Sequence, residues 1–222
     1  RAARLAALLS EDVRADGADL ARLERSLGSP PAHLRATASR VAEQEARLVA
    51  LASTVAPPGG AVPGAPVEPA AGAPRTREDA LALTVALARP EWIARKRPGS
   101  SAYVLAGGVG ALLPAGSPLE GQEWLAVASI DRAPASRHAR ILAAVPLSEE
   151  DALAAGAALL ETRTQASIDK GALTATRTRA LGAIPLASAP ASSLSEEEAI
   201  ALVAEHLAAR GLGDLGWGKE AS

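Results

Sequence analysis

The 222-residue sequence predicts an α+β fold: an N-terminal helical segment, a linker rich in Pro, Ala and Gly, a small β-barrel or sandwich, and a mixed α/β C-terminal extension. Three observations lead to this prediction. The first 52 residues are charged and carry apolar residues at helical spacing. Residues 55–74 are almost entirely Ala, Pro, Gly and Val, a composition that predicts a flexible connection. Short apolar runs separated by glycines and polar loops then follow between residues 102 and 145.

The helical segment contains two predicted helix starts after an opening helix over residues 1–9. Asp19 is placed to cap a short helix that stops at Gly28. Pro30 and Pro31 suit the first turn of a longer helix, where proline is tolerated. The apolar residues of that longer helix share one face: Leu34, Ala38, Val41, Leu48 and Ala52. This face carries too few large apolar side chains to stabilise a free-standing helix. We therefore expect the helix to dock against something outside these 222 residues.

The barrel region is predicted to begin with a helix and to continue as strands. Thr76 and Asp79 form a capping-box pattern, and Pro90 interrupts the helix that they start. Residues 103–105 and 109–113 flank a glycine pair, which predicts a hairpin. Two further strands, over 123–130 and 139–145, bring the predicted number in this region to four.

The C-terminal extension is predicted to mix helices and strands. Ser148 caps a short Ala-rich helix. Residues 162–168 and 172–178 predict a second hairpin, with a third strand around 183–187. A final helix is predicted to begin at Ser195 with Glu198, to bury Ile200, Val203 and Leu207, and to end at Gly211. The expected domains are a helical segment (1–52), a linker (53–76), a barrel (77–147) and the extension (148–222).

Composition excludes several classes of site. The chain has no Cys, which excludes disulfides and thiolate metal sites and fits a reducing, cytoplasmic compartment. The net charge of −2 gives no overall attraction to nucleic acid, so such binding would depend on local patches. No apolar run is long enough to span a bilayer, and no membrane partner is expected. Because the sequence begins at Arg1 and contains no Met, we expect a fragment of a longer protein.

Patterns that carry catalysis or metal binding are not found in the sequence. The three histidines, His33, His138 and His206, lack metal-ligand spacing, and we interpret each as a polar surface residue. Residues 213–220 resemble a phosphate-binding loop in the spacing of their glycines and lysine. Glu220, however, occupies the position where Ser or Thr would bind magnesium. Such a loop also needs a preceding strand, whereas a helix is predicted there. We therefore assign no catalytic residue, cofactor or metal to this chain.

Basic residues near predicted strand ends are the candidate contacts to nucleic acid. Positive charge on the loops and strand edges of a small barrel is a means of holding single-stranded nucleic acid. Tyr103 is the candidate for stacking on a base. The alternative, that the arginines only solvate the surface, stays open. The candidates are Arg95, Lys96, Arg97, Tyr103, Arg132, Arg137, Arg140, Arg177 and Arg179.

A succession of sequence blocks resembles the region after the motor domains in bacterial HrpB-type ATP-dependent RNA helicases, which are DEAH/DExH proteins of superfamily 2. The blocks follow the family's order: 88–97 (ARPEWIARKR), 103–111 (YVLAGGVGA), 123–128 (EWLAVA), 139–147, 161–163 (ETR) and 181–186 (LGAIPL). A weaker similarity covers 8–11 and 20–27. Two features depart from the family: the linker is longer, and family members continue past the position of Trp217.

The resemblance implies a ratchet-like helical domain for residues 1–52, an OB-fold for 77–147 and a truncated family-specific extension for 148–222. It implies two partners, single-stranded RNA or another nucleic acid and the motor domains of the same polypeptide. ATP and Mg²⁺ belong to those motor domains, whose motifs these residues lack. We therefore interpret the chain as an accessory helicase region without ATPase motifs. The alternative is a protein-interaction module that docks a partner without touching RNA, which the near-neutral charge and the scarcity of aromatic residues favour.

Overall fold

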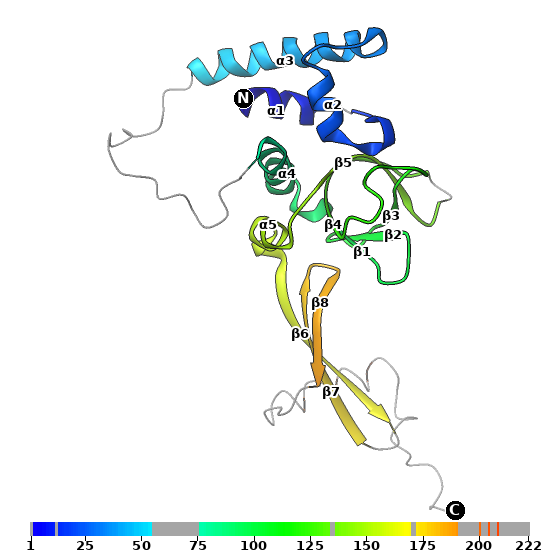
Figure 1. The fold of residues 1–222 in the computed structure, drawn as a ribbon. Coiled ribbons are helices and arrows are strands. Elements are labelled where there is room, and N and C mark those ends of the chain that lie inside the picture. Colours follow the sequence, from blue (N-terminus) through cyan, green and yellow to red (C-terminus); the bar gives the residue numbers. More distant parts are fainter. Residues whose placement is uncertain are drawn as a thin grey trace, which may run out of the picture. The chain divides into compact units, whose positions relative to one another are not determined.

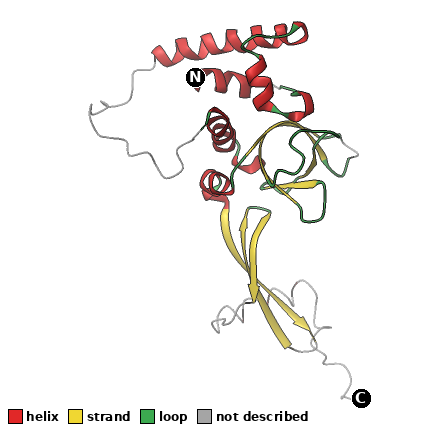
Figure 2. Cartoon of the chain, in the orientation of Figure 1, coloured by secondary structure: helices red, strands yellow, loops and turns green. Residues whose placement is uncertain are grey.

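The computed structural model describes residues 2–11, 13–54, 76–133, 136–169 and 172–190, together with positions 200, 204 and 208 (Figures 1 and 2). Contacts divide the chain into two compact units, Arg1–Ala157 and Ala158–Ser222. The first unit holds helices and a closed barrel, and the second holds a three-stranded sheet. These elements confirm the predicted α+β class.

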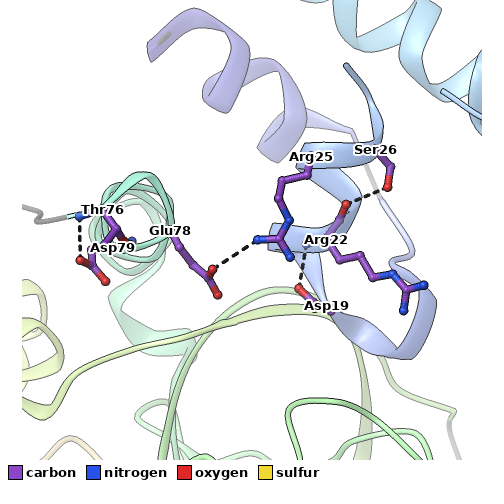
Figure 3. Close-up of polar contacts among 7 residues, drawn as sticks. All are labelled: Asp19, Arg22, Arg25, Ser26, Thr76, Glu78 and Asp79. Carbon is purple, nitrogen blue, oxygen red and sulfur yellow. Dashed lines mark hydrogen bonds and ion pairs between the residues drawn. The ribbon is translucent and has the colours of Figure 1, made fainter. Parts of the chain in front are cut away.

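The helical segment consists of α1 (Ala2–Ser10), α2 (Leu20–Ser26) and α3 (Arg35–Thr54), with short 3-10 turns at Asp16–Ala18 and Ala32–Leu34. Asp19 caps α2 as predicted, because its side chain accepts a hydrogen bond from the backbone N–H of Arg22 at 2.9 Å (Figure 3). The long helix α3 packs on α1 and buries Val41. α1 therefore covers part of the apolar face of α3, whereas Ala52 on the same face is exposed. The expected partner outside the chain stays a prediction.

The barrel is preceded by α4 (Arg77–Ala88), which starts with a complete capping box. The Thr76 hydroxyl accepts from the N–H of Asp79, and the Asp79 carboxylate accepts from the N–H of Thr76. The helix ends before Pro90, where a 3-10 turn (Pro90–Trp92) begins. Most of the predicted linker, residues 55–75, lies outside the described residues, as do most of the predicted final helix and residues 213–220.

Five strands close into a barrel within the described residues. They are β1 (Ile93–Lys96), β2 (Ala102–Leu105), β3 (Gly110–Leu112), β4 (Trp124–Asp131) and β5 (Ala139–Pro146). Their order is β1-β2-β3-β5-β4, with β1 paired to β4 and with β3 parallel to β5. A closed barrel of five strands is consistent with the expected OB-like fold. The predicted number of four strands was one too few, because β1 follows Pro90 closely and carries basic residues that obscure its apolar pattern.

The inner face of the barrel is packed with aliphatic side chains and one aromatic ring. The buried cluster includes Ala94, Tyr103, Leu105, Ala111, Leu125, Val127 and Ile141. On the outside, α4 packs against β4 and β5, and α5 (Glu149–Ala155) packs against α4 and β4. Ser148 caps α5 as predicted, accepting a hydrogen bond from the N–H of Asp151 at 3.0 Å. Because α5 packs on the barrel, the first unit extends to Ala157 rather than ending near residue 147.

Polar contacts join the helical segment to the barrel, although a long stretch of sequence separates them. Glu24 on α2 is 4% exposed. Its carboxylate forms an ion pair with Arg77 on α4. The same carboxylate lies 3.8 Å from Nε of Arg4 on α1, which makes a second ion pair. Figure 3 shows the neighbouring pair, in which Arg25 of α2 points to Glu78 of α4 at 3.4 Å. These pairs hold the N-terminal end of α4 against α2.

A second set of contacts fixes the 3-10 turn at Asp16–Ala18 to the barrel. The backbone N–H of Ala15 donates to the carbonyl of Leu142 at 2.9 Å, and the Ser117 hydroxyl donates to the carbonyl of Gly17 at 2.5 Å. Gly17 has a φ of +62°, and a Cβ there would lie 2.8 Å from Pro118. Only glycine therefore combines this backbone conformation with so close an approach.

The second unit is an antiparallel sheet of β6 (Leu160–Asp169), β7 (Ala172–Leu181) and β8 (Ile184–Pro190), in that order. The register pairs Asp169 with Ala172, which confirms the predicted hairpin, and β8 confirms the predicted third strand. None of the helices in the described part of the chain is long and apolar enough to cross a membrane.

Candidate nucleic-acid interface

The outer face of the barrel brings residues of β1, β2 and β3 and the residue before β5 into one row. The register places Arg95 of β1 beside Val104 of β2, and Val104 beside Gly110 of β3. On the other side of β3, Ala111 pairs with Ala139 of β5. The ring of His138, which directly precedes β5, lies against Gly110. One step further along, Leu112 of β3 pairs with Arg140 of β5. The outer face of β2 and β3, with the β1–β2 and β4–β5 loops, corresponds to the surface that OB-folds use for oligonucleotides.

The loop between β1 and β2 forms the basic end of this surface. It follows Lys96, begins with Arg97 and turns at Gly99, which has a φ of +67°. An open hollow beside it is lined by Arg95, Lys96, Arg97, residues 98–101, Gly121 and Glu123. Within the described residues, the side chains of Lys96 and Arg97 form no hydrogen bond or ion pair. Two positive charges in this hollow are therefore available to an anionic ligand.

Arg95 is the most restrained of the predicted contacts. Its guanidinium donates two hydrogen bonds to one carboxylate oxygen of Glu123, at 2.8 and 3.1 Å. The same group lies over the Trp124 ring, 5.1 Å from its centroid, and the side chain is 26% exposed. A guanidinium held by a carboxylate and an aromatic face contributes less free charge to a ligand than Arg97 does. Arg95 therefore serves first to shape this end of the barrel.

Tyr103 does not face the nucleic-acid surface, and its prediction as a stacking residue was wrong. Its side chain points into the barrel and is 1% exposed. The hydroxyl donates to the carbonyl of Gln122 at 2.7 Å. Burial, and to a lesser extent the charge of Glu120, raises the pKa of Tyr103 above its ordinary value. Tyr103 is therefore a core residue, and its buried hydroxyl forms a hydrogen bond with the loop before β4.

The loop between β4 and β5 carries the other basic group of the barrel. Arg132 and Arg137 are exposed there. The loop is held at its end by Ser136, whose hydroxyl donates to the carbonyl of His138 at 2.6 Å. Arg140 follows on β5 and is also exposed, opposite Asp131 of β4. The structure thus brings Arg137 and Arg140 to the edge of the same outer face as Leu112.

Two further arginines near this edge were missed by the sequence reasoning. Arg14 and Arg22 of the helical segment line, together with Arg140, a cavity of about 390 Å³ between the segment and the barrel. The guanidinium of Arg14 lies 3.7 Å from a carboxylate oxygen of Asp131. Asp16 also lines the cavity, so the lining of the cavity carries both positive and negative charge. No sequence signal links positions so far apart, because only the docking of the segment brings them together.

Arg177 and Arg179 belong to the second unit and are described with that unit alone. Both are exposed, and their spacing of two residues places them on the same face of β7. Their register partners are Thr164 and Thr162 on β6 and small residues on β8. The described part of the chain contains no cluster of His, Asp and Glu that could hold a metal ion.

Comparison with known proteins agrees with this fold. No protein-family model and no curated protein matches the chain. Two crystal structures of Escherichia coli HrpB, named as a DExH-box NTPase and as a DEAH/RHA helicase, match with TM-scores of 0.61 and 0.60 and identities of 23% and 21%. Each match covers 95% of this chain but 23% of the HrpB chain. The chain therefore shares its fold with a region of HrpB and spans about a quarter of that protein's length.

Proposed function

We propose that this chain is an accessory region of an ATP-dependent RNA helicase and that its OB-fold contacts single-stranded nucleic acid. The motor domains of the same polypeptide would bind ATP and Mg²⁺, and no catalytic step is assigned to the residues described here. The likeness to HrpB supports the placement in a helicase. The contact with nucleic acid is the finer part of the proposal and depends on the barrel surface.

The observation that carries the proposal is the position of the basic side chains on the OB-fold. Arg97 lies in the loop after β1, and Arg132 and Arg137 lie in the loop before β5. These are the two loops with which OB-folds bind oligonucleotides. None of the three forms an ion pair within the described residues, whereas Arg95 and Arg14 do. A net charge of −2 does not oppose binding when positive groups gather in local patches, here one at each of the two loops.

Salt dependence of binding tests this proposal. The parent chain should bind a single-stranded RNA with an affinity that falls steeply as salt rises, because phosphate contacts release counterions. Three to five contacts would give a log–log slope of about −2 to −3.5, from roughly 0.7 per phosphate. Replacing Arg97, Arg137 and Arg140 together by Gln should flatten the slope and lower the affinity for all sequences alike, since phosphate contacts carry no base information.

The matched control removes the same charge from α3. Replacing Arg35, Arg40 and Arg47 by Gln deletes three exposed arginines of the helical segment and should leave the slope unchanged. Both triple variants should keep the stability of the parent chain, because exposed ion pairs contribute little. If the barrel variant binds RNA as well as the parent does, the protein-docking function becomes the better account. The exposed Leu87 on α4, 59% accessible, would then be the first surface to examine for a protein partner.

A further inference from the structure

His138 occupies a position on the barrel surface that its sequence context does not reveal. It is half-buried and directly precedes β5. A Cβ on Gly110 would lie 2.9 Å from the Cδ2 atom of the His138 ring and 3.5 Å from Nε2. The imidazole therefore rests against the outer side of β3, in the space that any other residue at position 110 would fill.

The surroundings of the ring combine apolar and basic groups. Val104 is the register partner of Gly110 on β2. Leu112, two residues along β3 on the same outer side, is 37% exposed. Arg140 is its register partner on β5 and is exposed. A flat ring next to exposed aliphatic surface and flanked by arginines is suited to an unpaired nucleobase whose phosphates reach the basic groups.

Hydrogen bonds of the local backbone fix the residue that carries the ring. The Ser136 hydroxyl donates to the His138 carbonyl at 2.6 Å and accepts from the His138 N–H at 3.3 Å. These bonds fix the residue from which the ring projects, and Gly110 fixes the side on which it rests. A ring that projects from a fixed backbone and already rests on β3 loses less conformational entropy when a ligand stacks on it than a ring on a mobile loop would.

We propose that His138 is the base-stacking residue of this surface, the role that the sequence suggested for the buried Tyr103. The proposal rests on the proposed function and adds to it the class of group that is recognised: an unpaired nucleobase next to the phosphates. The ring stacks on one base without reading its identity, because every base offers a flat face.

The test compares two ligands that carry the same phosphates. The full chain is titrated with a short oligouridylate and with an abasic ribose-phosphate strand of the same length. Stacking on one base should make the parent bind the oligouridylate about 5- to 150-fold more tightly than the abasic strand. His138→Ala should remove this preference and leave the affinity for the abasic strand unchanged, whereas His138→Phe should keep the preference.

Controls separate the ring from the fold and from charge. His33→Ala removes an exposed histidine of the helical segment and should change neither affinity. Arg137→Gln should weaken both ligands equally. If His138→Ala disturbs the circular dichroism spectrum, His138→Leu fills similar space without a flat ring and should show the same loss of preference.

The outcomes distinguish this inference from the proposed function. Equal affinity of the parent for both strands, with a steep salt dependence, would keep the phosphate contacts and overturn the stacking role. Retention of the full preference by the Ala and Leu variants would overturn it as well. If neither strand binds the parent chain, both the proposed function and this inference are wrong.

Discussion

Two rings, those of Tyr103 and His138, lie on opposite sides of the barrel wall. For Tyr103 the alternation of the strand decides the side. Successive side chains of a strand point to opposite faces, so a change of one position moves a ring from the surface to the core. The pattern around Tyr103 predicted a strand correctly but did not show which face is inside. That choice depends on the register of β2 with β1 and β3, which is a tertiary property. His138 precedes its strand, and its contact with Gly110 joins two segments distant in sequence.

The buried hydroxyl of Tyr103 should make stability fall at high pH. Because burial raises the pKa of Tyr103 in the folded state above its ordinary value of 10.0, its contribution is fully present below that pH. The contribution is lost as the pH rises through the folded pKa. Tyr103 is the sole tyrosine, so the tyrosinate absorbance titrates this residue alone. A midpoint at or below 10 in the folded chain would show that the ring is not buried.

The contact between Gly110 and His138 predicts a change of sign in a double-mutant cycle. Gly110→Ala should destabilise the parent chain by about 0.5–1.5 kcal/mol, because its Cβ would lie 2.9 Å from Cδ2 of His138 and the ring must leave its position. In a His138→Ala background the same change should be neutral or stabilise the fold by about 0.4–1 kcal/mol, through the lower entropy of the unfolded chain. Urea denaturation measures both values. Equal effects in the two backgrounds would mean that the ring does not rest on Gly110.

At the scale of elements, helix starts were predictable and some strands were not. The caps at Asp19, Thr76 and Ser148 were all predicted, because a cap depends on residues three or four positions apart. β1 was missed because Ile93–Lys96 becomes a strand only through its pairing with β2 and β4. The basic character of that segment was recognised, but its place on the barrel wall was not.

The capping box at the start of α4 should have a measurable effect on stability. Thr76→Ala removes the acceptor for the N–H of Asp79 and should lower the free energy of unfolding by about 1 kcal/mol. Thr76→Ser keeps the hydroxyl and should retain most of the stability. Thr54→Ala, at the C-terminal end of the preceding helix α3, is the control. Its free energy of unfolding should stay within about 0.5 kcal/mol of the parent value. Equal stability of the Thr76→Ala and Thr54→Ala variants would argue against the cap.

At the scale of the whole molecule, the docking of the helical segment on the barrel was the least predictable feature. The sequence separates them by a stretch of Ala, Pro and Gly, and the expected domains followed that composition. In the structure the segment and the barrel form one unit, held by the buried Glu24 and by the contacts of the turn at Asp16–Ala18. Ion pairs between distant helices leave no local pattern in a sequence. The arginines around the 390 Å³ cavity could not be grouped in advance for the same reason.

Docking of this kind predicts that the unit survives a cut in its connection. A protease site introduced between residues 55 and 75 should, after cleavage, leave the two fragments together in gel filtration. Glu24→Gln removes the charge that pairs with Arg4 and Arg77 and should weaken their association. Glu43→Gln, which breaks an exposed pair with Arg47 on α3, is the matched control and should not. Separation of the parent fragments at micromolar concentration would show that the segment does not dock.

The location of bound RNA on the chain is the most direct test of the proposed function. A single-stranded RNA carrying a photoreactive uridine is crosslinked to the full chain at low salt, and the modified peptides are identified by mass spectrometry. The account predicts crosslinks within residues 97–101 and 132–140, the two loops and the strand start that carry Arg97, Arg137, His138 and Arg140. Crosslinks confined to α3, or none under conditions where RNA is bound, would contradict it.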